Sequence, residues 1–461
     1  MQSGDVFPFA PTVALEHMAR TAPLSADEAE ASESLAFAQV YGSPASRGLL
    51  HHYFLERDNR KQPGLVDLSI EVEPVKSVAI IGAGLMGKSI ATRCVKAGIT
   101  ARLLDADPSK AARAAEEIEA ESGRGSGTAL AIDSYQGLEG ADLVIESVVE
   151  TASVKTNVLG KAAGIDGAPA WFATNTSAIP IESLAESAKD KSQFCGIHFC
   201  HPELMSLVEV ICGPDTGEAT VARSVNFVRQ LRMMPVAIND CPGFVVNRLL
   251  AAMLNQALQL YAEGYSIESI DQAVREFGFR GGPFQIIDII GADTCMYAGR
   301  SMWENGLKCV SMSPILPRMV KINRLGRKVN QGFYLYGGDE TNLEPNFDPA
   351  VDDLLKDYRA GETRQVDIEQ LESIAVRIMA HMAVEAARIV EEEIVNEPGD
   401  IDLCLIHGLS FPARRGGLLF WADLVGVSEL DQIVGVSSNG NLPPELWTKM
   451  VAEDGRFYGA G

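Results

Sequence analysis

The sequence predicts an α/β protein in which a doubly wound sheet is followed by a duplicated all-α domain. Three observations predict this fold. Short apolar runs alternate with helical stretches from Val75 to about Ile238, as in a sheet whose strands are joined by helices. After Cys241-Pro-Gly the pattern becomes helical. Two stretches of this helical half share one spacing of charged residues and glycines, which indicates an internal repeat.

The first 74 residues precede the sheet and carry no strand signal. Ala26–Arg57 is predicted to be helical, with a break near Gly42, which Ser and Pro follow. Asn59–Gly64 is polar and is typical of a linker. We therefore expect residues 1–74 to form a helical N-terminal extension.

The segment that begins the sheet carries the most informative motif of the chain. Val78–Ile81 is a short apolar run, which is typical of a strand buried on both faces. Gly82, Gly84 and Gly87 follow with the spacing G-x-G-x-x-G. In a dinucleotide site the first glycine makes the tight turn, the second lets the backbone approach a pyrophosphate, and the third lets the helix pack closely on the strand.

A helix and a second strand follow in the order that such a site requires. Apolar residues at helical spacing predict a helix that begins with Leu85 and Met86 and ends at Gly98, and its N-terminal dipole favours phosphate. Thr100–Leu104 is the second strand, and Asp105 follows it, eighteen residues after the last glycine of the motif. A carboxylate there accepts hydrogen bonds from a ribose and repels a 2′-phosphate. An isolated glycine motif fits an ordinary turn equally well, but the whole series predicts a Rossmann-type site for NAD.

Polar segments end several of the remaining strands. The further strands are expected at Asp142–Ile145, Ala170–Ala173, Phe194–His198, Leu207–Ile211 and Pro235–Ile238. Ligands of open α/β sheets bind beyond the carboxyl ends of the strands. Three polar segments are expected at that edge: Thr174-Asn-Thr-Ser177, His198-Phe-Cys-His-Pro202, and Glu209.

These residues suit the oxidation of an alcohol. A histidine can take the hydroxyl proton while hydride leaves, and a carboxylate on its other nitrogen stabilises the imidazolium. We assign these roles to His198 and Glu209, because a carboxylate in so apolar a strand needs a partner. Ser177 and Asn247 can hydrogen-bond the substrate oxygen. His201 competes for the role of base, and a histidine at a strand end is more often only structural.

The helical half contains an internal repeat. Arg248 and Glu263 are fifteen residues apart, as are Arg377 and Glu392, and two later pairs of glycines are followed at matching intervals by Asp and Gly: Gly281-Gly282, Asp288 and Gly291 in one copy, Gly416-Gly417, Asp423 and Gly426 in the other. Asn247 precedes the first Arg, whereas Val376 precedes the second. This difference predicts one working copy and one that serves packing.

Composition narrows the class of protein. The chain has 461 residues and a formal net charge of −23, which argues against a nucleic-acid partner and an anionic membrane. Its eight cysteines form no C-x-x-C pair, so we expect reduced thiols in a cytoplasmic protein without a metal site. No apolar run is long enough for membrane insertion, and residues 1–11 do not resemble a signal peptide.

At this point the residues resemble a known family. From about Val75 to Gly426 the chain is similar to the dehydrogenase part of the fatty-acid oxidation multifunctional enzymes, in the L-3-hydroxyacyl-CoA dehydrogenase family. The matching motifs are GAGLMG, ADLVIESVVE with Lys155 five residues on, the NTS of Asn175–Ser177, HFxxP, LVEVI, DxPGFVVNR, GFxxGPFQIIDIIG and LGRK…GFY. Leu35–Arg57 resembles the segment that joins the hydratase and dehydrogenase halves.

The resemblance implies roles for the site residues. His198 is the base and Glu209 its partner, and Ser177 and Asn247 contact the substrate oxygen. The cofactor is NAD, which contacts the glycine motif with Leu85 and Met86, and also Asp105, Glu150, Lys155 and Asn175, with Glu150 towards the nicotinamide. Single-copy members dimerise through the helical domain, so the resemblance implies a monomer with an internal pseudo-dimer of helical domains.

The chain departs from the family pattern in three respects. We find no counterpart of the hydratase half, so we expect no hydration chemistry. The spacing of His198 and Glu209 is one residue shorter than is usual, and the shortening lies between Pro202 and Met205. The segment between Asp105 and Asp142 is also short, and the shortened part resembles the helical arm that helps to hold CoA.

Together these inferences predict an enzyme for the NAD-dependent oxidation of L-3-hydroxyacyl-CoA to 3-oxoacyl-CoA. The shortened arm favours an alternative, a dehydrogenase of a smaller or carrier-bound 3-hydroxy acid. A non-catalytic NAD-binding subunit, docked on a hydratase or thiolase partner chain, is the third interpretation. The expected domains are the N-terminal extension (1–74), the NAD-binding Rossmann domain (75–239), a first helical C-domain (240–345) and a degenerate second copy (346–461).

Overall fold

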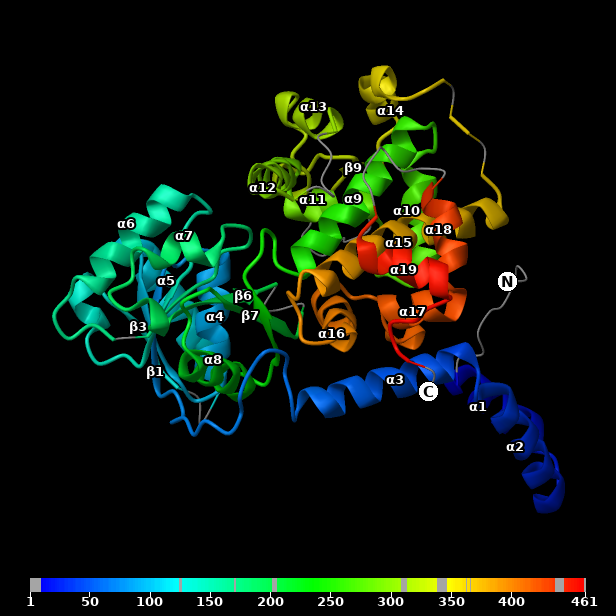
Figure 1. Ribbon diagram of the computed structural model, residues 1–461, viewed down its shortest axis with the longest axis horizontal. Coiled ribbons are helices and arrows are strands. Elements are labelled where there is room, and N and C mark those ends of the chain that lie inside the picture. Colours follow the sequence, from blue (N-terminus) through cyan, green and yellow to red (C-terminus); the bar gives the residue numbers. More distant parts are fainter. Residues whose placement is uncertain are drawn as a thin grey trace.

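The computed structural model consists of a sheet-containing half and a helical half (Figure 1). It describes residues 10–123, 127–169, 171–200, 205–307, 313–337, 346–361, 363–364, 366–435 and 443–459. In Figure 1 the sheet lies on the left and the helices on the right, with helix α3 running below the helical half.

The first half is an eight-stranded sheet with the order β3-β2-β1-β4-β5-β6-β7-β8. All neighbouring strands are parallel except β6 and β7, which are antiparallel. The strands are β1 (Ser77–Ile81), β2 (Thr100–Leu104), β3 (Ala129–Ala131), β4 (Leu143–Glu146), β5 (Phe172–Thr174), β6 (Phe194–Phe199), β7 (Leu207–Cys212) and β8 (Met234–Asn239). The predicted doubly wound sheet is therefore confirmed.

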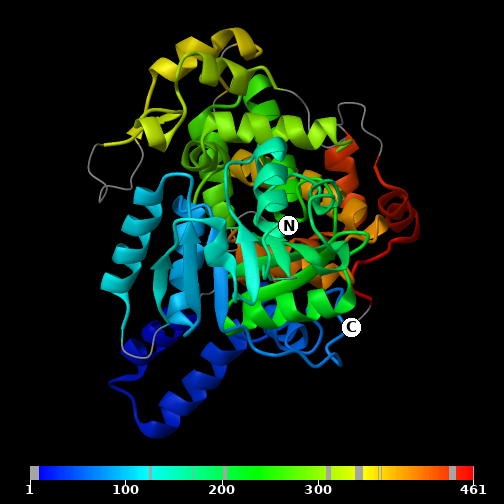
Figure 2. The same ribbon diagram turned by 90° about the vertical axis from the view of Figure 1, so that its left-hand side faces the viewer.

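Helices cover both faces of this sheet (Figure 2). The side chains of one face share a core with helices α4 (Leu85–Lys96), α5 (Pro108–Glu121) and α8 (Glu218–Gln230). The other face packs with α6 (Ala152–Ala163) and α7 (Ile181–Ala185), and its core continues without a break into the helical half. That second face therefore lies next to the junction between the two halves.

The helical half contains two sets of helices that pack on each other. Its two longest helices, α9 (Val246–Ala262) and α15 (Ile368–Glu391), lie side by side at its centre. The first set continues with α10 (Ile267–Phe277), α11 (Pro283–Ile290), α12 (Ala292–Glu304) and α13 (Ile315–Lys321), and the second with α16 (Pro398–Gly408), α17 (Leu418–Val425), α18 (Val427–Gly435) and α19 (Glu445–Glu453). Helix α14 (Ala350–Leu355) lies between the two sets in the sequence.

The repeat predicted from the sequence is visible in the contacts between these sets. Arg248 of α9 donates to Glu392 at 2.6 Å, and Arg377 of α15 donates to Glu263 through two hydrogen bonds of 2.6 Å. Each copy thus supplies an arginine to the glutamate of the other. Such a reciprocal exchange is what a two-fold related pair of copies produces.

The aspartates of the repeat also have matching surroundings. Asp288 accepts hydrogen bonds from the backbone N–H groups of Phe333 and Tyr334, and Asp423 accepts the same pair from Phe457 and Tyr458. In both copies the aspartate carboxylate therefore stabilises a turn. This pattern assigns the repeated aspartates a structural function and explains why both copies keep them.

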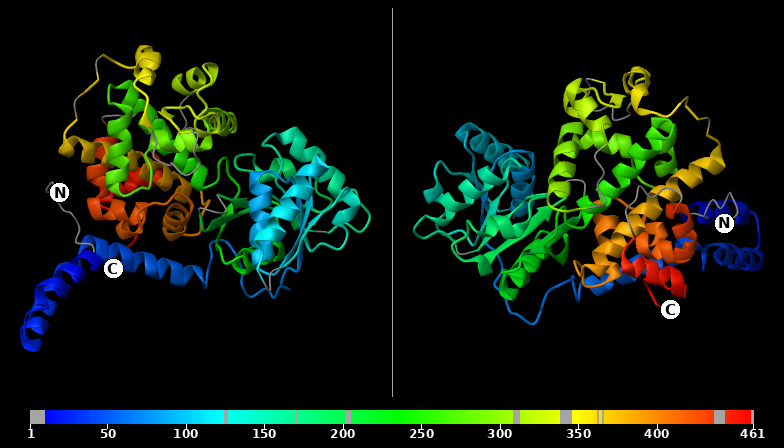
Figure 3. Two further views of the ribbon diagram at one scale, coloured as in Figure 1. Left: turned by 180° about the vertical axis from the view of Figure 1, so that it is seen from behind. Right: turned by 45° about the horizontal axis from the view of Figure 1, so that its top comes forward.

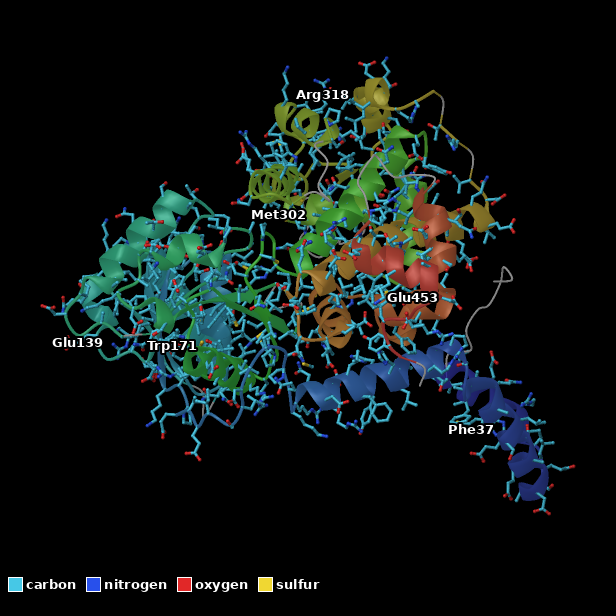
Figure 4. All side chains as sticks on the ribbon, viewed as in Figure 1. Phe37, Glu139, Trp171, Met302, Arg318 and Glu453 are labelled. Carbon is cyan, nitrogen blue, oxygen red and sulfur yellow. The ribbon has the colours of Figure 1, made fainter. Side chains whose placement is uncertain are left out.

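Three helices form the N-terminal segment: α1 (Ala10–Thr21), α2 (Ala26–Val40) and α3 (Pro44–Asn59). Helix α3 packs against α16 and against the backbone near Arg414, which a Cβ at Gly48 would strike. Helices α1 and α2 pair with each other and project from the body of the molecule (Figure 3). Phe37 marks this projection in Figure 4, and its side chain is exposed.

The structure differs from the sequence-based expectations in several places. Strand β3 was not expected, and the helical half contains a short strand β9 (Tyr334–Leu335), which pairs with β10 (Asn346–Phe347). Strand β5 begins at Phe172, two residues later than the predicted start. Among the described residues, no helix has the length and apolar character needed to span a membrane.

Candidate active site

The glycine motif forms a cradle at the carboxyl end of β1. Gly82 has a φ of 110°, and a Cβ there would strike the backbone of Ser147. A Cβ at Gly87 would strike the carbonyl oxygen of Gly82, so this glycine lets α4 approach the strand. A Cβ at Gly84 would meet nothing within 4 Å. The first and third glycines are thus needed for packing, and the second leaves open space in front of the backbone.

The surroundings of this cradle fit a dinucleotide. Gly84 caps helix α4 without a side-chain hydrogen bond, so the N–H groups of the first turn are available to phosphate. Leu85 at the start of the helix is 70% exposed, and Met86 beside it is partly buried. Asp105 follows β2, and its Oδ2 accepts a hydrogen bond of 2.8 Å from the Ala83 N–H. Asp105 therefore fixes the glycine turn as well as presenting a carboxylate where a ribose is expected.

The histidine and glutamate predicted to act together form a hydrogen bond. His198 Nδ1 and Glu209 Oε2 are 2.7 Å apart, and both residues are buried. Glu209 Oε1 accepts hydrogen bonds of 2.9 and 3.1 Å from the N–H groups of Val245 and Val246, at the start of α9. Both carboxylate oxygens are therefore satisfied, and Nε2 is the histidine nitrogen left for a ligand.

Strand direction explains how these two side chains meet. Glu209 lies within its strand, as expected, and β7 runs antiparallel to β6. His198 and Glu209 are directly opposite each other in the register of the two strands. Residues so paired project from the same face of a sheet and their side chains touch. The pair thus forms although the spacing of the two residues is one residue short.

The loop after β5 is held by Glu150. Its Oε1 accepts hydrogen bonds from the Thr176 hydroxyl at 2.6 Å and from the Ser177 N–H at 2.8 Å. Lys155 Nζ lies 3.2 Å from Glu150 Oε2. Burial alone would raise the pKa of Glu150, but the charge of Lys155 and the hydrogen bonds from Thr176 and Ser177 lower this pKa below its usual range. Glu150 is therefore an ionised anchor for the loop that carries Ser177.

Lys155 has a second partner that sequence reasoning missed. Its Nζ lies 2.9 and 3.0 Å from the two carboxylate oxygens of Glu146, and both side chains are buried. Glu146 also accepts a hydrogen bond of 2.7 Å from the Thr174 hydroxyl at the end of β5. The signal was present in the sequence, because a glutamate that ends an apolar strand needs a cationic partner.

Two asparagines fasten the same region. Asn247 Nδ2 donates to the Ser177 carbonyl oxygen at 2.9 Å, which joins the start of α9 to the loop after β5. Asn175 Oδ1 accepts a hydrogen bond of 2.9 Å from the Phe199 N–H, next to His198. The structure thus brings Ser177, Asn247 and His198 together, while Asn175 links two neighbouring strands.

A cavity of about 250 Å³ opens beside His198, which forms a dyad with Glu209. His198, Ser177 and Asn247 line one part of it together with Cys200. Most of the remaining lining is apolar and comes from the helical half, including Leu250, Leu254, Leu258, Met302, Leu316 and Pro317. In Figure 4 Met302 marks the part of the helical half that faces the sheet. The cavity therefore offers a polar reacting end and an apolar wall for a chain of methylene groups.

Two further residues, His201 and Cys200, lie close to His198 in the sequence. His201, the competing base, lies outside the described residues. Cys200 was not singled out as a site residue, yet its Sγ lies 4.0 Å from Glu209 Oε2, and burial raises the pKa of its thiol. The thiol is therefore neutral, and Cys200 contributes a wall of the cavity rather than a nucleophile.

Comparisons with known proteins agree with this geometry. The model of the 3-hydroxyacyl-CoA dehydrogenase NAD binding domain matches residues 77–241, and that of the 3-hydroxyacyl-CoA dehydrogenase C-terminal domain matches residues 243–336. A fatty acid oxidation complex subunit alpha from Pseudomonas aeruginosa is 31% identical over 448 residues, which are 93% of this chain. The chain spans 61% of the length of that relative.

Solved structures share the fold. A 3-hydroxybutyryl-CoA dehydrogenase from Escherichia coli K12 superposes with a TM-score of 0.68 over 83% of this chain and 99% of its own, at 23% identity. A (S)-3-hydroxybutyryl-CoA dehydrogenase from Ralstonia eutropha gives a TM-score of 0.53 at 29% identity, over 57% of this chain and 100% of its own. The chain belongs to the 3-hydroxyacyl-CoA dehydrogenase family, and residues 77–241 are its NAD-binding domain.

Proposed function

We propose that this chain oxidises an L-3-hydroxyacyl-CoA to the 3-oxoacyl-CoA, with NAD as the oxidant and His198 as the base. One observation carries the proposal: the hydrogen-bonded pair of His198 and Glu209 lies beside a largely apolar cavity, and β6 of His198 belongs to the same sheet as β1, which ends in the dinucleotide cradle. The names of the relatives support the same reaction class.

The roles of the residues follow from their contacts. His198 Nε2 takes the proton of the C3 hydroxyl, and Glu209 stabilises the imidazolium that forms. Ser177 and Asn247 orient the substrate oxygen while it changes from hydroxyl to carbonyl. NAD, when bound at the cradle of Gly82, Gly84, Leu85, Met86 and Gly87, supplies the acceptor for the hydride that leaves C3.

The cofactor roles of four further residues belong to the same proposal. Asp105 binds the adenosine ribose. Glu150 and Lys155 support the nicotinamide side, since they hold the loop that carries Ser177. Asn175, which directly follows β5, is a further contact of the cofactor in this proposal, and its side chain is held by the Phe199 N–H.

The substrate class has one competitor, which rests on the short segment between β2 and β4. Between β2 and β4 the chain provides helix α5, strand β3 and one turn of 3-10 helix, Tyr135–Leu138. This segment is shorter than the family pattern, and the short arm indicates weaker binding of CoA. A dehydrogenase of a smaller or carrier-bound 3-hydroxy acid is therefore the second candidate.

The substrate proposal is tested by following NADH oxidation with three substrates side by side. These are acetoacetyl-CoA, free acetoacetate and an acetoacetyl thioester on a carrier protein. We expect acetoacetyl-CoA to have the highest kcat/KM. A higher value for the carrier thioester or the free acid would transfer the proposal to the second candidate. Tight NADH binding without turnover of any substrate would support a non-catalytic NAD-binding subunit.

The proposal extends to organisation and partners. We divide the chain into the extension (1–74), the NAD-binding domain (75–239), a first helical domain (240–345) and a second, degenerate copy (346–461). The exposed side chains of Leu35 and Phe37 on α2, and of Tyr41 directly after it, support docking of a hydratase or thiolase chain on this extension. A relative that is a subunit of a fatty acid oxidation complex supports such a partner and a cytoplasmic location.

A further inference from the structure

A second group of ligand-type side chains lies where helix α3 packs on helix α16. His52 and Glu56 are one turn apart on α3, and His407 is in the last turn of α16. The two Nε2 atoms are 3.2 Å apart. Glu56 Oε1 lies 3.2 Å from His407 Nε2 and 3.4 Å from His52 Nε2. The three atoms thus form a nearly equilateral triangle.

The size of this triangle matches the coordination shell of a metal ion. Ligand atoms about 2.0–2.1 Å from a tetrahedral zinc ion are roughly 3.3 Å from one another. Two imidazoles and one carboxylate are also a ligand set that zinc accepts, whereas calcium and magnesium prefer oxygen alone.

The other nitrogen of His407 is held in the way that a metal ligand requires. His407 Nδ1 and Ser206 Oγ are 2.8 Å apart. When Nδ1–H donates to this hydroxyl, the lone pair of Nε2 faces the Glu56 carboxylate across 3.2 Å. Two lone pairs at that distance repel each other, and a cation between them replaces repulsion by coordination.

We propose that His52, Glu56 and His407 bind a divalent transition-metal cation of the zinc class. Their side chains are 18%, 31% and 15% exposed, so water can complete a four-coordinate shell. The ion joins the N-terminal helix α3 to helix α16 of the second helical set. Through Ser206, it also reaches the segment that leads into β7, the strand of Glu209.

This site is separate from the dyad. His198, Cys200 and Glu209 are the other group of described residues whose ligand atoms lie close together. Both oxygens of Glu209 already accept hydrogen bonds, and Cys200 keeps its proton, so that group is a poor competitor for metal. The experiment must nevertheless tell the two groups apart.

The test is a calorimetric titration of the full-length chain with zinc chloride, after removal of metals by a chelator. We expect one zinc ion per chain. His52→Ala and Glu56→Gln should each weaken binding at least 100-fold, because each removes one of three ligands. His17→Ala, on helix α1, is the matched histidine control and should bind zinc as the unmodified chain does. His52 and Glu56 lie on a partly exposed helix, and circular dichroism verifies that these variants are folded.

A second measurement locates the ion directly. Crystals soaked with zinc should give an anomalous difference peak among His52, Glu56 and His407. Zinc should also raise the melting temperature of the unmodified chain by a few degrees and leave that of His52→Ala unchanged. The proposal is overturned by a chain that binds no zinc, by binding that survives both substitutions, or by a peak at His198.

Discussion

Glu209 is buried in an apolar strand, and each of its oxygens has a hydrogen-bond donor. Its charge is therefore compensated before His198 gains a proton. Glu209→Gln replaces one acceptor oxygen by an amide, which cannot stabilise an imidazolium. We expect kcat to fall roughly 10²- to 10⁴-fold, with little change in the Kd of NADH. Steady-state kinetics and fluorescence titration measure the two quantities.

The control for this prediction is Glu218→Gln, which changes an exposed glutamate on α8. An unchanged kcat in Glu209→Gln would remove Glu209 from the proposed mechanism. A large loss of NADH affinity instead would indicate that Glu209 acts on the shape of the cofactor site.

Asp105 holds the glycine turn, and we propose that its carboxylate also binds the ribose of the cofactor. Asp105→Ala should raise the KM for NAD about tenfold or more, since a hydrogen bond to a charged group is worth roughly 1.5–3 kcal/mol. The KM for NADP should change less, so the preference for NAD narrows. Kinetics with both cofactors, and Asp133→Ala as the exposed control, measure this change. Equal efficiency of the unmodified protein with the two cofactors would contradict the assignment.

Glu150 gives a prediction for acidic pH. Its pKa is lower in the folded chain than its usual value of 4.5, so the folded chain binds this proton less tightly than the unfolded chain does. The stability that Glu150 contributes is present above about pH 4.5 and is lost as the pH falls through its folded pKa. In urea titrations below pH 4.5, the stability of the unmodified chain should therefore fall more steeply than that of Glu150→Gln. Glu116→Gln, exposed on α5, should follow the unmodified chain; parallel pH profiles for all three would refute the assignment.

Single residues of the site differ in how far the sequence predicted them. His198 and Glu209 could be paired, because a carboxylate in an apolar strand demands a partner. The direct hydrogen bond between them confirms that pairing. The ion pair of Lys155 with Glu146 was missed, although Glu146 ends an apolar strand and a carboxylate there needs a cationic partner.

At the scale of elements, arginine–glutamate ion pairs hold the contact between α9 and α15, and these pairs differ in how far they are buried. Arg248 is buried and donates to Glu385 at 2.5 Å, and Glu385 is buried as well. Arg377 and Glu263 are partly exposed. Removal of a partner from a buried pair leaves an uncompensated charge, which is far costlier than the loss of a surface pair.

Arg248→Met should therefore destabilise the helical half by about 3 kcal/mol. The effect is at the lower end of the usual range, because Arg388 lies 3.4 Å from the other oxygen of Glu385 and keeps part of its compensation. Arg300→Met, which removes an exposed pair with Glu304, should cost less than about 1 kcal/mol. Denaturant midpoints measure both changes. Equal effects of the two substitutions would show that burial of an ion pair does not determine how much stability its removal costs.

The direction of β7 was not predicted, although the sequence contained the information to assign it. Only residues 200–206 separate β6 from β7. Two parallel neighbouring strands need a crossover connection of a dozen or more residues. A connection as short as this one therefore requires an antiparallel pair. Strand β3 is a different case. Ala129–Ala131 is three residues long at the edge of the sheet and only its first residue is buried, so no alternation of apolar and polar residues marks it.

At the scale of the whole molecule, the second helical set supports the site, and none of its described residues lines the cavity. Its helix α15 covers α9, whose first turn donates to Glu209 and carries Asn247. Its helix α16 packs against β7 itself. The repeat in the sequence predicted that the two copies pack on each other, and the reciprocal ion pairs agree. The contact of α16 with the sheet could not be predicted, because it depends on how the two halves meet.

Truncation after residue 337 should separate these contributions. It removes α15–α19 and uncovers the apolar face of α9 and the buried charge of Arg248, so the shortened chain should aggregate or dimerise. Activity should be lost although His198, Glu209, Ser177 and Asn247 all remain, because α16 no longer supports β7 and α15 no longer holds α9. Light scattering after size-exclusion chromatography measures the mass, and NADH oxidation measures the activity. The full-length chain, the control, should be a monomer. If the shortened chain were monomeric and fully active, the second set would be an appended module, and its packing on α9 would have no part in forming the site.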